Sequence, residues 1–402
     1  MKIAVVSDMH IGYERFYDDA YEQAREALAK AAEMADVIVL PGDIFDKRAP
    51  KPEVIAQALS LFRELNGIEW KTKVEWFKGQ GRAFSSAPIV AISGTHERTA
   101  AGKENPLGLL ALAGLLIDAS ESQVLLEKDG ERVAVYGLGG LSEERVVEKL
   151  KELDPKPVDG AFNIFMLHQS IYEILPFDNS FMHYDDLPKG FDLYLCGHIH
   201  SRVKSTVHGK LFLIPGSTVL TQLKEGEQEK KGFILFDTQK YSYEFVEIES
   251  RPFIVKRLEF KNASIAEIRK KCDEAIAECV ERSKKKPIVK LYLEGTFELG
   301  GSSELGLRAL IMKHAGDAIL EMDTSGLKEP EIEKSIEGIR ENSIDSIGIK
   351  DIGMQLLRSR LKELGFKDAI NVGELFEILS DQKTSKKEKI IENALKFLEE
   401  EP

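Results

Sequence analysis

The stretch from residue 186 to residue 200 reads DLPKGFDLYLCGHIH, and the prediction of the fold starts from it. Its centre, from Leu193 to Cys196, is a short apolar run of the kind that forms a buried strand. His198 and His200 follow this run, with one residue between them. In open α/β sheets, ligands bind at the carboxyl ends of the strands. The stretch therefore predicts an α/β fold with a histidine-containing site at a strand end.

Four other segments have the same arrangement, in which polar residues directly follow an apolar run. The runs are residues 3–7, 37–41, 89–93 and 163–167. The polar residues that follow them are Asp8 and His10, then Asp43, then Thr95, His96 and Glu97, and finally His168. Of the 8 histidines in the chain, five lie in these segments and the one above. This concentration indicates one shared site.

Imidazole and carboxylate ligands together are typical of a transition-metal site. Two divalent cations roughly 3.5–4 Å apart can clamp a phosphodiester and activate the water that attacks it. Mixed nitrogen and oxygen ligands suit manganese, iron or zinc, whereas magnesium and calcium prefer oxygen alone. An aspartate such as Asp43 can bridge both ions, and His198 and His200 can each send one ring to a different ion.

Each segment taken alone has an ordinary explanation. A Gly-Asp pair marks turns in many proteins, and an aspartate and a histidine at a strand end often belong to a turn. An isolated His168 is more often a buried histidine with a simple hydrogen-bond partner. The order of all five segments, each after a predicted strand, is what favours a metal site.

The set of motifs resembles the calcineurin-type metallophosphoesterase superfamily. Within it, residues 186–200, the hexapeptide SDMHIG at 7–12 and the pentapeptide GDIFD at 42–46 resemble the SbcD nucleases and their relatives of the meiotic recombination eleven family. These archaeal and bacterial enzymes repair DNA double-strand breaks. The resemblance covers residues 1–240 and implies an α/β fold with a four-layer αββα core of mixed sheets.

The resemblance also implies a role for each site residue. One metal ion would be held by four residues, namely Asp8, His10, Asp43 and His200. The other would be held by Asp43 as a bridge and by Thr95, His168 and His198. His96 would sit over the scissile phosphate, stabilising charge or protonating the leaving oxygen. Glu97 would orient a neighbouring group.

Position 95 departs from the family pattern, which usually has asparagine there. The asparagine amide oxygen ligates the second metal, and the oxygen of Thr95 reaches less far and is a weaker neutral donor. We expect catalysis to survive with a higher metal requirement. The alternative is that Thr95 is a harmless local variant.

By resemblance, the chain is expected to be a manganese-dependent DNA nuclease with two Mn²⁺ ions. The implied activities are 3′–5′ exonuclease and single-strand endonuclease, used in double-strand-break repair and end processing. The implied partners are DNA, a second copy of the chain and an SMC-type coiled-coil ATPase. The alternatives are a small-nucleotide phosphodiesterase of the same fold and a non-catalytic interaction scaffold. Protein phosphatases are excluded, because their Asp-Arg-Gly pattern is absent from residues 46–49, which read DKRA.

Composition and charge agree with a globular enzyme of several domains. The 402 residues are 43% hydrophobic and 31% charged, which predicts two or three domains. No apolar stretch approaches the ~20 residues that span a bilayer. The expected location is therefore cytoplasmic and nucleoid-associated, with no membrane partner. The net charge of −13 is unusual for a DNA-binding protein, but basic residues follow the metal motifs. The candidates for DNA contact are Lys47, Arg48, Arg98 and Arg202.

Patterning along the chain predicts three parts. Residues 1–250 would form the nuclease domain, residues 251–326 a small α/β capping domain that selects DNA, and residues 327–402 a helical segment that binds the partner. Within the first part, the aromatic and basic insertion at 70–84 either contacts nucleic acid or packs on the body of the protein or on a second subunit. The charged segment 224–231 is predicted to be an exposed hairpin connection.

Overall fold

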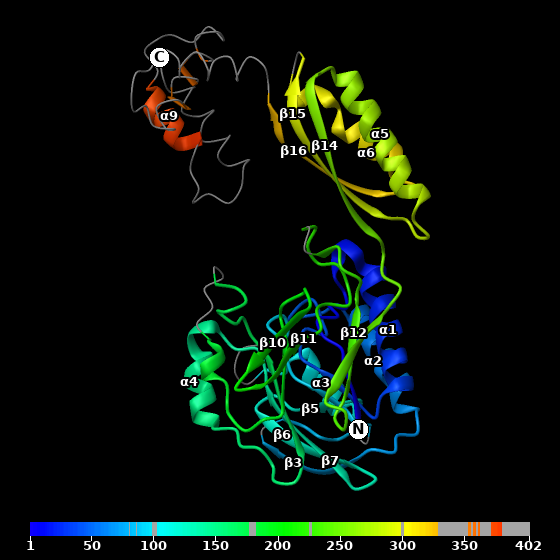
Figure 1. Cartoon of the computed structure of the whole chain (residues 1–402), viewed down its shortest axis with the longest axis vertical. Coiled ribbons are helices and arrows are strands. Elements are labelled where there is room, and N and C mark those ends of the chain that lie inside the picture. Colours follow the sequence, from blue (N-terminus) through cyan, green and yellow to red (C-terminus); the bar gives the residue numbers. More distant parts are fainter. Residues whose placement is uncertain are drawn as a thin grey trace. The chain divides into compact units, whose positions relative to one another are not determined.

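The computed structural model describes residues 1–79, 81–85, 87–98, 103–176, 182–224, 227–298 and 301–328, and also 353, 354, 357, 358, 361 and 371–379. The chain divides into two compact units, Met1–Phe253 and Ile254–Pro402 (Figure 1). The boundary expected between residues 250 and 251 lies close to this division. The second expected boundary, after residue 326, falls inside the second unit.

Two mixed sheets form the centre of the first unit. The first sheet has six strands in the order β13-β12-β1-β2-β4-β5, and the second has seven in the order β10-β11-β9-β8-β7-β6-β3. The strands of the first sheet are β1 (Lys2–Val5), β2 (Val37–Leu40), β4 (Ile89–Ala91), β5 (Ile117–Asp118), β12 (Gly232–Asp237) and β13 (Ser242–Glu247). Those of the second sheet are β3 (Lys73–Gly79), β6 (Ser122–Lys128), β7 (Glu131–Leu138), β8 (Phe162–His168), β9 (Leu193–Gly197), β10 (Val203–Val207) and β11 (Lys210–Ile214).

The polar motifs follow strands that pair in parallel, so the carboxyl ends of these strands lie close together. In the first sheet β2 pairs in parallel with both β1 and β4, and in the second sheet β8 pairs in parallel with both β7 and β9. The carboxyl ends of neighbouring parallel strands lie at the same edge of their sheet. The polar residues that follow β1, β2, β4, β8 and β9 are therefore delivered to these edges.

Helices cover the outer face of each sheet. Side chains alternate between the two faces of a strand, so Ile3 of β1 faces the apolar layer between the sheets while Ala4 faces the helices. The first sheet is covered by α1 (Tyr17–Met34), α2 (Pro52–Asn66) and α3 (Pro106–Leu112), and the second by α4 (Glu143–Leu153). Figure 1 shows α4 on one side of the strands and α1 and α2 on the other. The predicted four-layer αββα core is confirmed.

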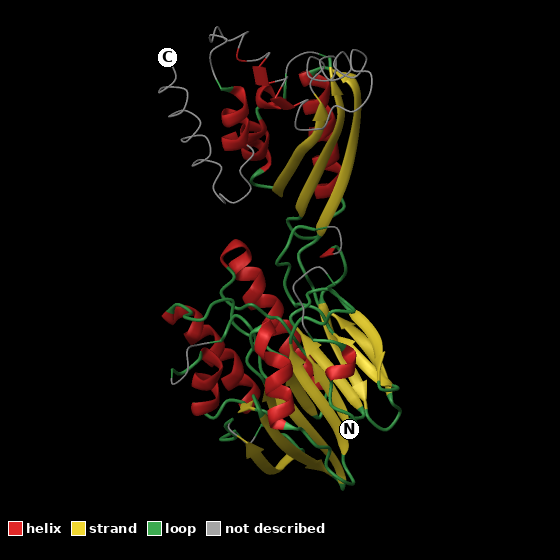
Figure 2. Cartoon of the chain, turned by 90° about the vertical axis from the view of Figure 1, so that its left-hand side faces the viewer, coloured by secondary structure: helices red, strands yellow, loops and turns green. Residues whose placement is uncertain are grey.

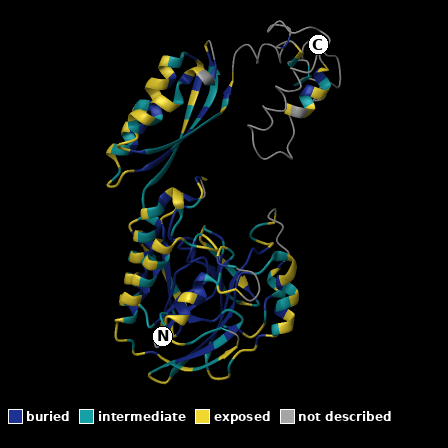
Figure 3. Cartoon of the chain, turned by 180° about the vertical axis from the view of Figure 1, so that it is seen from behind, coloured by how far each residue is buried: buried dark blue, intermediate teal, exposed yellow. Residues whose placement is uncertain are grey.

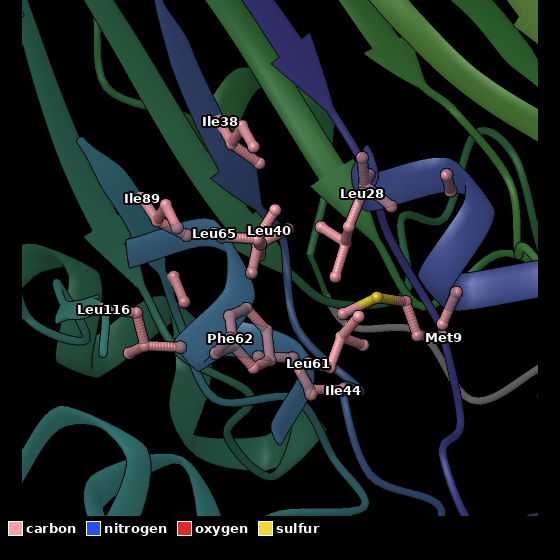
Figure 4. Close-up of a cluster of buried hydrophobic side chains, with 14 of the residues drawn as sticks. Met9, Leu28, Ile38, Leu40, Ile44, Leu61, Phe62, Leu65, Ile89 and Leu116 are labelled. Atoms are coloured by element: carbon pink, nitrogen blue, oxygen red, sulfur yellow. The ribbon is translucent and has the colours of Figure 1, made fainter. Parts of the chain in front are cut away.

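Helix α2 illustrates why the layers hold together. Pro52 occupies its first turn, where the missing N–H costs no hydrogen bond and the fixed φ favours a helix. Its buried residues recur at helical spacing and are Val54, Ala58, Leu61, Phe62 and Leu65. In Figure 4 Phe62 lies among side chains of neighbouring elements, including Leu40 and Ile89. Figure 3 shows the resulting contrast between buried strands and helices with an exposed outer face.

The second unit contains a three-stranded sheet with helices packed on it (Figure 2). Its strands are β14 (Phe253–Ala263), β15 (Ile288–Phe297) and β16 (Ile319–Lys328), and its helices are α5 (Ile265–Glu281) and α6 (Leu307–His314). Helix α5 begins with a capping box, in which Ser264 and Glu267 each accept a hydrogen bond from the other's backbone N–H. These elements lie where the sequence predicts a compact α/β unit.

Part of the expected C-terminal helical segment is described. Helix α9 (Val372–Leu379) forms a small apolar cluster in which Leu361, Val372 and Leu375 are buried. The part of this expected segment from residue 380 to residue 402 lies outside the described residues. Among the helices in the part of the chain that the structure describes, none has the length and apolar character needed to cross a membrane.

The insertion at 70–84 is more regular than a loop. Strand β3 lies within it and pairs antiparallel with β6 at the edge of the second sheet. Trp70 packs against the helical core of the first sheet, and Phe77 packs against the layer between the sheets. Phe84 is 66% exposed. Two of the four aromatic residues of the insertion, Trp70 and Phe77, therefore follow the second alternative and pack on the body of the protein.

The prediction of an exposed hairpin at 224–231 is wrong in its topology and right in its exposure only in part, since Lys224, Gln228, Glu229 and Lys230 are exposed. The segment connects β11 of the second sheet to β12 of the first, so it is not a hairpin. Glu227 and Lys231 are buried, with 8% and 6% of their surface exposed. Their charge alone predicted exposure, but Lys231 Nζ and Glu227 Oε2 lie 2.9 Å apart and form an ion pair, which makes burial tolerable.

Candidate metal centre

Among the described residues, three groups of three side chains could each hold a metal ion, and two of these groups contain a buried aspartate. In the first group, ligand atoms of Asp8, His10 and His200 all lie within 4.8 Å of one another. In the second, the same holds for Asp43, His168 and His198. These are the residues predicted as metal ligands, apart from Thr95. Each group mixes imidazole nitrogen with carboxylate oxygen, the donor set expected for a divalent transition metal.

The first group is centred on two facing imidazole nitrogens. His10 Nε2 lies 3.1 Å from His200 Nε2, and His200 Nε2 lies 3.8 Å from Asp8 Oδ1. Asp8 is fully buried and is held by the hydroxyl of Ser7, which donates to Oδ2 at 2.6 Å, and by the backbone N–H of His198, which donates to Oδ1 at 3.0 Å. Burial raises the pKa of the Asp8 carboxyl, which shows how much this group needs a nearby positive charge.

The second group has a buried nitrogen that fits a metal ion. His168 Nδ1 donates to the carbonyl oxygen of Pro41 at 2.6 Å, which turns Nε2 toward Asp43 Oδ2 at 3.2 Å. Nε2 is buried and makes no well-formed hydrogen bond to any of the described residues. A ring nitrogen and a carboxylate oxygen that are close but not hydrogen-bonded can share one cation. Hydrogen bonding at the opposite ring nitrogen is the usual way in which a liganding histidine is oriented.

The charges of the second group also favour a cation. Burial lowers the pKa of His168, but the Asp43 carboxylate outweighs it and raises that pKa to about 9. Burial likewise raises the pKa of Asp43, yet the adjacent positive charge of His168 holds it well below its usual range. The pair therefore stabilises positive charge in a buried place. A divalent cation supplies that charge in place of a proton.

His200 differs from His168 because it is kept neutral. Burial, followed by the neighbouring charges of His10 and Lys231, lowers the pKa of His200 well below its usual value. A neutral imidazole keeps a lone pair for a metal ion. The residues of the two groups thus fit divalent metal ions in donor type, burial and charge.

Thr95 lies beside the second group. Its hydroxyl donates to Asp43 Oδ2 at 3.4 Å, at the long end for a hydrogen bond. The neighbouring backbone N–H of His96 donates to Asp43 Oδ1 at 2.9 Å. The loop after β4 therefore supports Asp43 from two sides, and it places the oxygen of Thr95 near the oxygen that faces His168.

His96 belongs to the third group, with His10 and with Asp46, a residue that sequence reasoning did not single out. His96 Nδ1 donates to the backbone oxygen of Asp46 at 2.5 Å, and its side chain is 45% exposed. The carboxylate of Asp46 lies 3.5 Å from His10 Nδ1, and the rings of His10 and His96 meet edge to face at 4.9 Å. The position of Asp46 in the loop after β2, with two residues between it and Asp43, was the signal in the sequence that could have identified it.

Glu97 joins two of the loops that carry site residues. It is fully buried and accepts hydrogen bonds from the backbone N–H groups of Phe45 at 3.0 Å and Gly94 at 2.8 Å. Burial, reinforced by the nearby Asp43 carboxylate, raises the pKa of Glu97 to about 7. Gly94 itself must lack a side chain, because a Cβ atom there would overlap the carboxylate of Asp43.

The backbone of the centre is strained at the ligands themselves. Asp8, His10, Asp43 and His198 all have positive φ, at 51°, 46°, 48° and 79°. Such conformations cost a non-glycine residue of the order of 1–3 kcal/mol and persist where packing enforces them. Met9, between two ligands, and the Ile44 that follows Asp43 supply that packing. Both are fully buried in the helical core (Figure 4).

The four candidate DNA contacts lie in different surroundings. Lys47 Nζ pairs with Glu14 at 2.7 Å. Arg202 pairs with Glu229 at 3.1 Å and stacks over the ring of Phe245 at 4.1 Å. Arg48 is exposed and Arg98 is half-buried. Exposed ion pairs contribute little to stability, so Lys47 can exchange its partner for a phosphate at little cost.

Known proteins resemble the chain across both units. Residues 1–241 match the calcineurin-like phosphoesterase superfamily domain. The double-strand break repair protein MRE11 of Encephalitozoon cuniculi is 30% identical over 314 residues, which cover 71% of this chain and 54% of that protein. The DNA double-strand break repair protein Mre11 of Methanocaldococcus jannaschii is 27% identical over 302 residues, covering 72% and 75%. That of Methanopyrus kandleri is 28% identical over 280 residues, covering 62% and 57%.

These relatives extend well beyond the matched region, since the chain spans between 54% and 75% of their length. The domain match nevertheless covers more than half of this chain and contains every residue of the two ligand groups. The predicted resemblance is therefore confirmed: the chain belongs to the calcineurin-like phosphoesterase superfamily and, within it, to the Mre11 family.

Proposed function

We propose that the protein is a DNA nuclease that hydrolyses phosphodiester bonds with two divalent metal ions, preferably Mn²⁺, and processes DNA ends in double-strand-break repair. The observation that carries the proposal is the pair of ligand groups, each with buried carboxylate and imidazole donors, at adjoining strand ends. The printed names of the relatives support the choice of DNA as substrate, because they describe double-strand break repair proteins.

Each ion would have its own set of ligands. The first would be held by Asp8, His10, Asp43 and His200, and the second by Asp43, Thr95, His168 and His198. When bound, two such ions lower the pKa of a water molecule and stabilise the charge on the phosphate oxygens. The protein contributes the placement of the ligands, which the buried hydrogen bonds to Asp8, Asp43 and His168 hold before the metal arrives.

His96 would act on the phosphate rather than on a metal ion. Its ring is more exposed than the rings of the liganding histidines, and the hydrogen bond from Nδ1 to the oxygen of Asp46 directs Nε2 away from Asp46. From there His96 can donate a hydrogen bond to a phosphate oxygen or a proton to the leaving oxygen. Asp46 is a positioning residue in this account, and Glu97 is another.

The proposed activities are 3′–5′ exonuclease and single-strand endonuclease. Arg48 and Arg98 follow the loops that bear Asp43 and His96, so they can contact the phosphates of a bound strand. The second unit would act as a DNA-selecting domain, and the helical segment 327–402 would bind an SMC-type ATPase. Removal of residues 380–402 tests that last role, because undiminished binding of the ATPase would exclude the terminal residues from the interface.

A homodimer is proposed on the basis of an exposed apolar patch. Ile68 after α2, Phe84 after β3, and Leu109 and Leu112 of α3 are 41%, 66%, 40% and 51% exposed. Asn66 ties these segments together, because its side chain donates to the oxygen of Leu115 and accepts from the hydroxyl of Ser85. The apolar residues of α2 between 54 and 62 are largely buried in the core, so they do not contribute to this patch.

Titration of Mn²⁺ into the purified protein with linear and circular single-stranded DNA tests the proposed function. Cutting of both substrates that saturates with Mn²⁺ is the expected result. Hydrolysis of cyclic or bis-nucleotides without cutting of either DNA would instead favour the small-nucleotide phosphodiesterase. Mn²⁺ binding without any hydrolysis would favour the scaffold.

A further inference from the structure

The connection between β11 and β12 packs against His200. It contacts the side of the ring that faces away from His10 and Asp8. The backbone N–H of Ser217 donates to the carbonyl oxygen of His200 at 3.1 Å. Gly216 has a φ of 79°, and a Cβ atom there would lie 2.8 Å from the same oxygen. The connection can approach His200 this closely only because position 216 has no side chain.

A chain of hydrogen bonds starts at the rear nitrogen of the His200 ring. His200 Nδ1 contacts the hydroxyl of Thr221 in a very short hydrogen bond. The same hydroxyl lies 3.3 Å from Glu227 Oε1, which in turn lies 3.8 Å from His200 Nδ1. A carboxylate only accepts hydrogen bonds, so the hydroxyl donates to Glu227 and accepts from the N–H at Nδ1. This order leaves the lone pair of His200 on Nε2.

Glu227 is held in turn by a buried ammonium group. Lys231 Nζ donates to Glu227 Oε2 at 2.9 Å and to Ser217 Oγ at 3.0 Å, and it lies 3.5 Å from the carbonyl oxygen of His200. A buried ion pair is costly to desolvate and is weak evidence for stability. Here both charges are arranged around one histidine, which indicates that the pair serves that residue.

Thr221 also has a hydrogen-bond partner in the loop that follows β1. Tyr13, three residues after His10, donates its hydroxyl hydrogen to the backbone oxygen of Thr221 at 2.7 Å. The backbone of Thr221 is thus held by the loop that also carries His10, a residue of the first group. Hydrogen-bond partners on the far side of a liganding histidine set its tautomer and raise its basicity.

We propose that Thr221 and Glu227 are positioning residues for the metal ion bound by His200: the Glu227 carboxylate, fixed by Lys231, orients the Thr221 hydroxyl so that it accepts the Nδ1–H of His200 and leaves Nε2 free for the metal. The inference rests on the proposed function, because it requires a metal ion at the first group. It concerns one ion of the two, since Thr221 contacts no ligand of the second group among the contacts that the structure describes.

The test is a titration of Mn²⁺ into the full-length protein, followed by the electron paramagnetic resonance signal of the unbound ion. The Thr221→Val variant keeps the shape of the side chain but cannot accept a hydrogen bond from Nδ1. Loss of the partner of a metal-bound histidine typically weakens metal binding about 10–100-fold. We expect this loss for one of the two ions and wild-type affinity for the other.

Two variants separate positioning from simple packing. Thr221→Ser restores the hydroxyl and is expected to bind both ions as the wild type does. Thr218→Val removes a hydroxyl from the same connection that is fully buried, more so than that of Thr221, and has no hydrogen-bond partner among the described residues. It is expected to leave both affinities unchanged. Glu227→Gln should weaken the same ion as Thr221→Val, because the Thr221 hydroxyl loses its charged acceptor.

Each remaining outcome counts against the inference. Unchanged Mn²⁺ binding by Thr221→Val overturns it, and so does equal weakening in Thr221→Val and Thr218→Val, which indicates packing alone. A melting temperature in EDTA that falls for Thr221→Val but not for Thr218→Val assigns the hydroxyl to folding and also overturns it. Failure of the wild-type protein to bind Mn²⁺ contradicts the proposed function itself, which distinguishes the two failures.

Discussion

His10 Nε2 and His200 Nε2 face each other at 3.1 Å in the first ligand group. The other nitrogen of each ring lies near an oxygen atom: His200 Nδ1 is hydrogen-bonded to Thr221, and His10 Nδ1 lies 3.5 Å from Asp46 Oδ1 without a well-formed hydrogen bond. With protons on both Nδ1 atoms, two lone pairs point at one another. This arrangement is repulsive until a cation or a proton lies between them.

Mn²⁺ is therefore expected to raise the melting temperature of the protein. A ligand at a hundred times its dissociation constant adds about 2.7 kcal/mol to the free energy of unfolding. Thermal melting in EDTA and in excess Mn²⁺ measures the effect. His10→Ala should lose much of the increase, whereas His208→Ala, outside both ligand groups, should retain it. A melting temperature that does not respond to Mn²⁺ would contradict the assignment of the ligands.

Thr95→Asn is expected to lower the Mn²⁺ concentration needed for half-maximal cleavage. The amide oxygen of asparagine reaches further than the hydroxyl of Thr95, which at present donates to Asp43 at 3.4 Å. We expect a change of about tenfold, comparable to the effect of groups that orient a metal ligand. Activity is measured against Mn²⁺ concentration at saturating DNA. An unchanged requirement would mean that Thr95 is a neutral variant.

Glu97→Gln is expected to lower the free energy of unfolding by about 1–3 kcal/mol, because one of two buried N–H groups, on Phe45 and Gly94, loses its acceptor. Urea denaturation in EDTA measures the change without a contribution from metal binding. The matched control is Glu22→Gln on the exposed side of α1, which should change stability by less than about 0.5 kcal/mol. Equal effects for both variants would show that Glu97 does not join the two loops.

Most of the centre could be predicted from the sequence because its residues follow apolar strands directly. The strand pattern and the rule that ligands lie at strand ends are enough to predict four of the ligands, namely Asp8, Asp43, His168 and His198. The four-layer core was predictable from the family resemblance. The alternation of Ile3 and Ala4 between two apolar layers gives the physical reason.

The residues that were missed depend on contacts that no local pattern records. Thr221 and Glu227 lie in a connection between the two sheets, and their charges and hydroxyl predict a solvated loop unless Lys231 is known to be buried beside them. Strand β3 was missed because its partner β6 is far along the chain, so no short turn between the two marks them as a pair. Asp46 acts partly through its backbone oxygen, which side-chain identity cannot reveal.

Leu112→Lys is expected to convert a dimer into a monomer. Leu112 is 51% exposed in the apolar patch on α3, and a lysine there would bury an unpaired charge at the interface. Sedimentation equilibrium measures the association constant, which should fall by at least about tenfold. Met312→Lys is the control, since Met312 is 70% exposed in the second unit. If Leu112→Lys remains dimeric, the patch is not the interface.

The most direct test of the account is the comparison of His96→Ala with the wild type in Mn²⁺ binding and in cleavage of single-stranded DNA. His96 belongs to neither ligand trio that contains the buried carboxylates Asp8 and Asp43, so the variant should bind both ions normally. Loss of a group that assists proton transfer should slow cleavage about 10²–10⁴-fold. The exposed His183, replaced by alanine, should leave both properties unchanged. Two results would contradict the account. If His96→Ala cleaves DNA at the wild-type rate, His96 does not act on the phosphate, and if His96→Ala no longer binds Mn²⁺, His96 is a metal ligand.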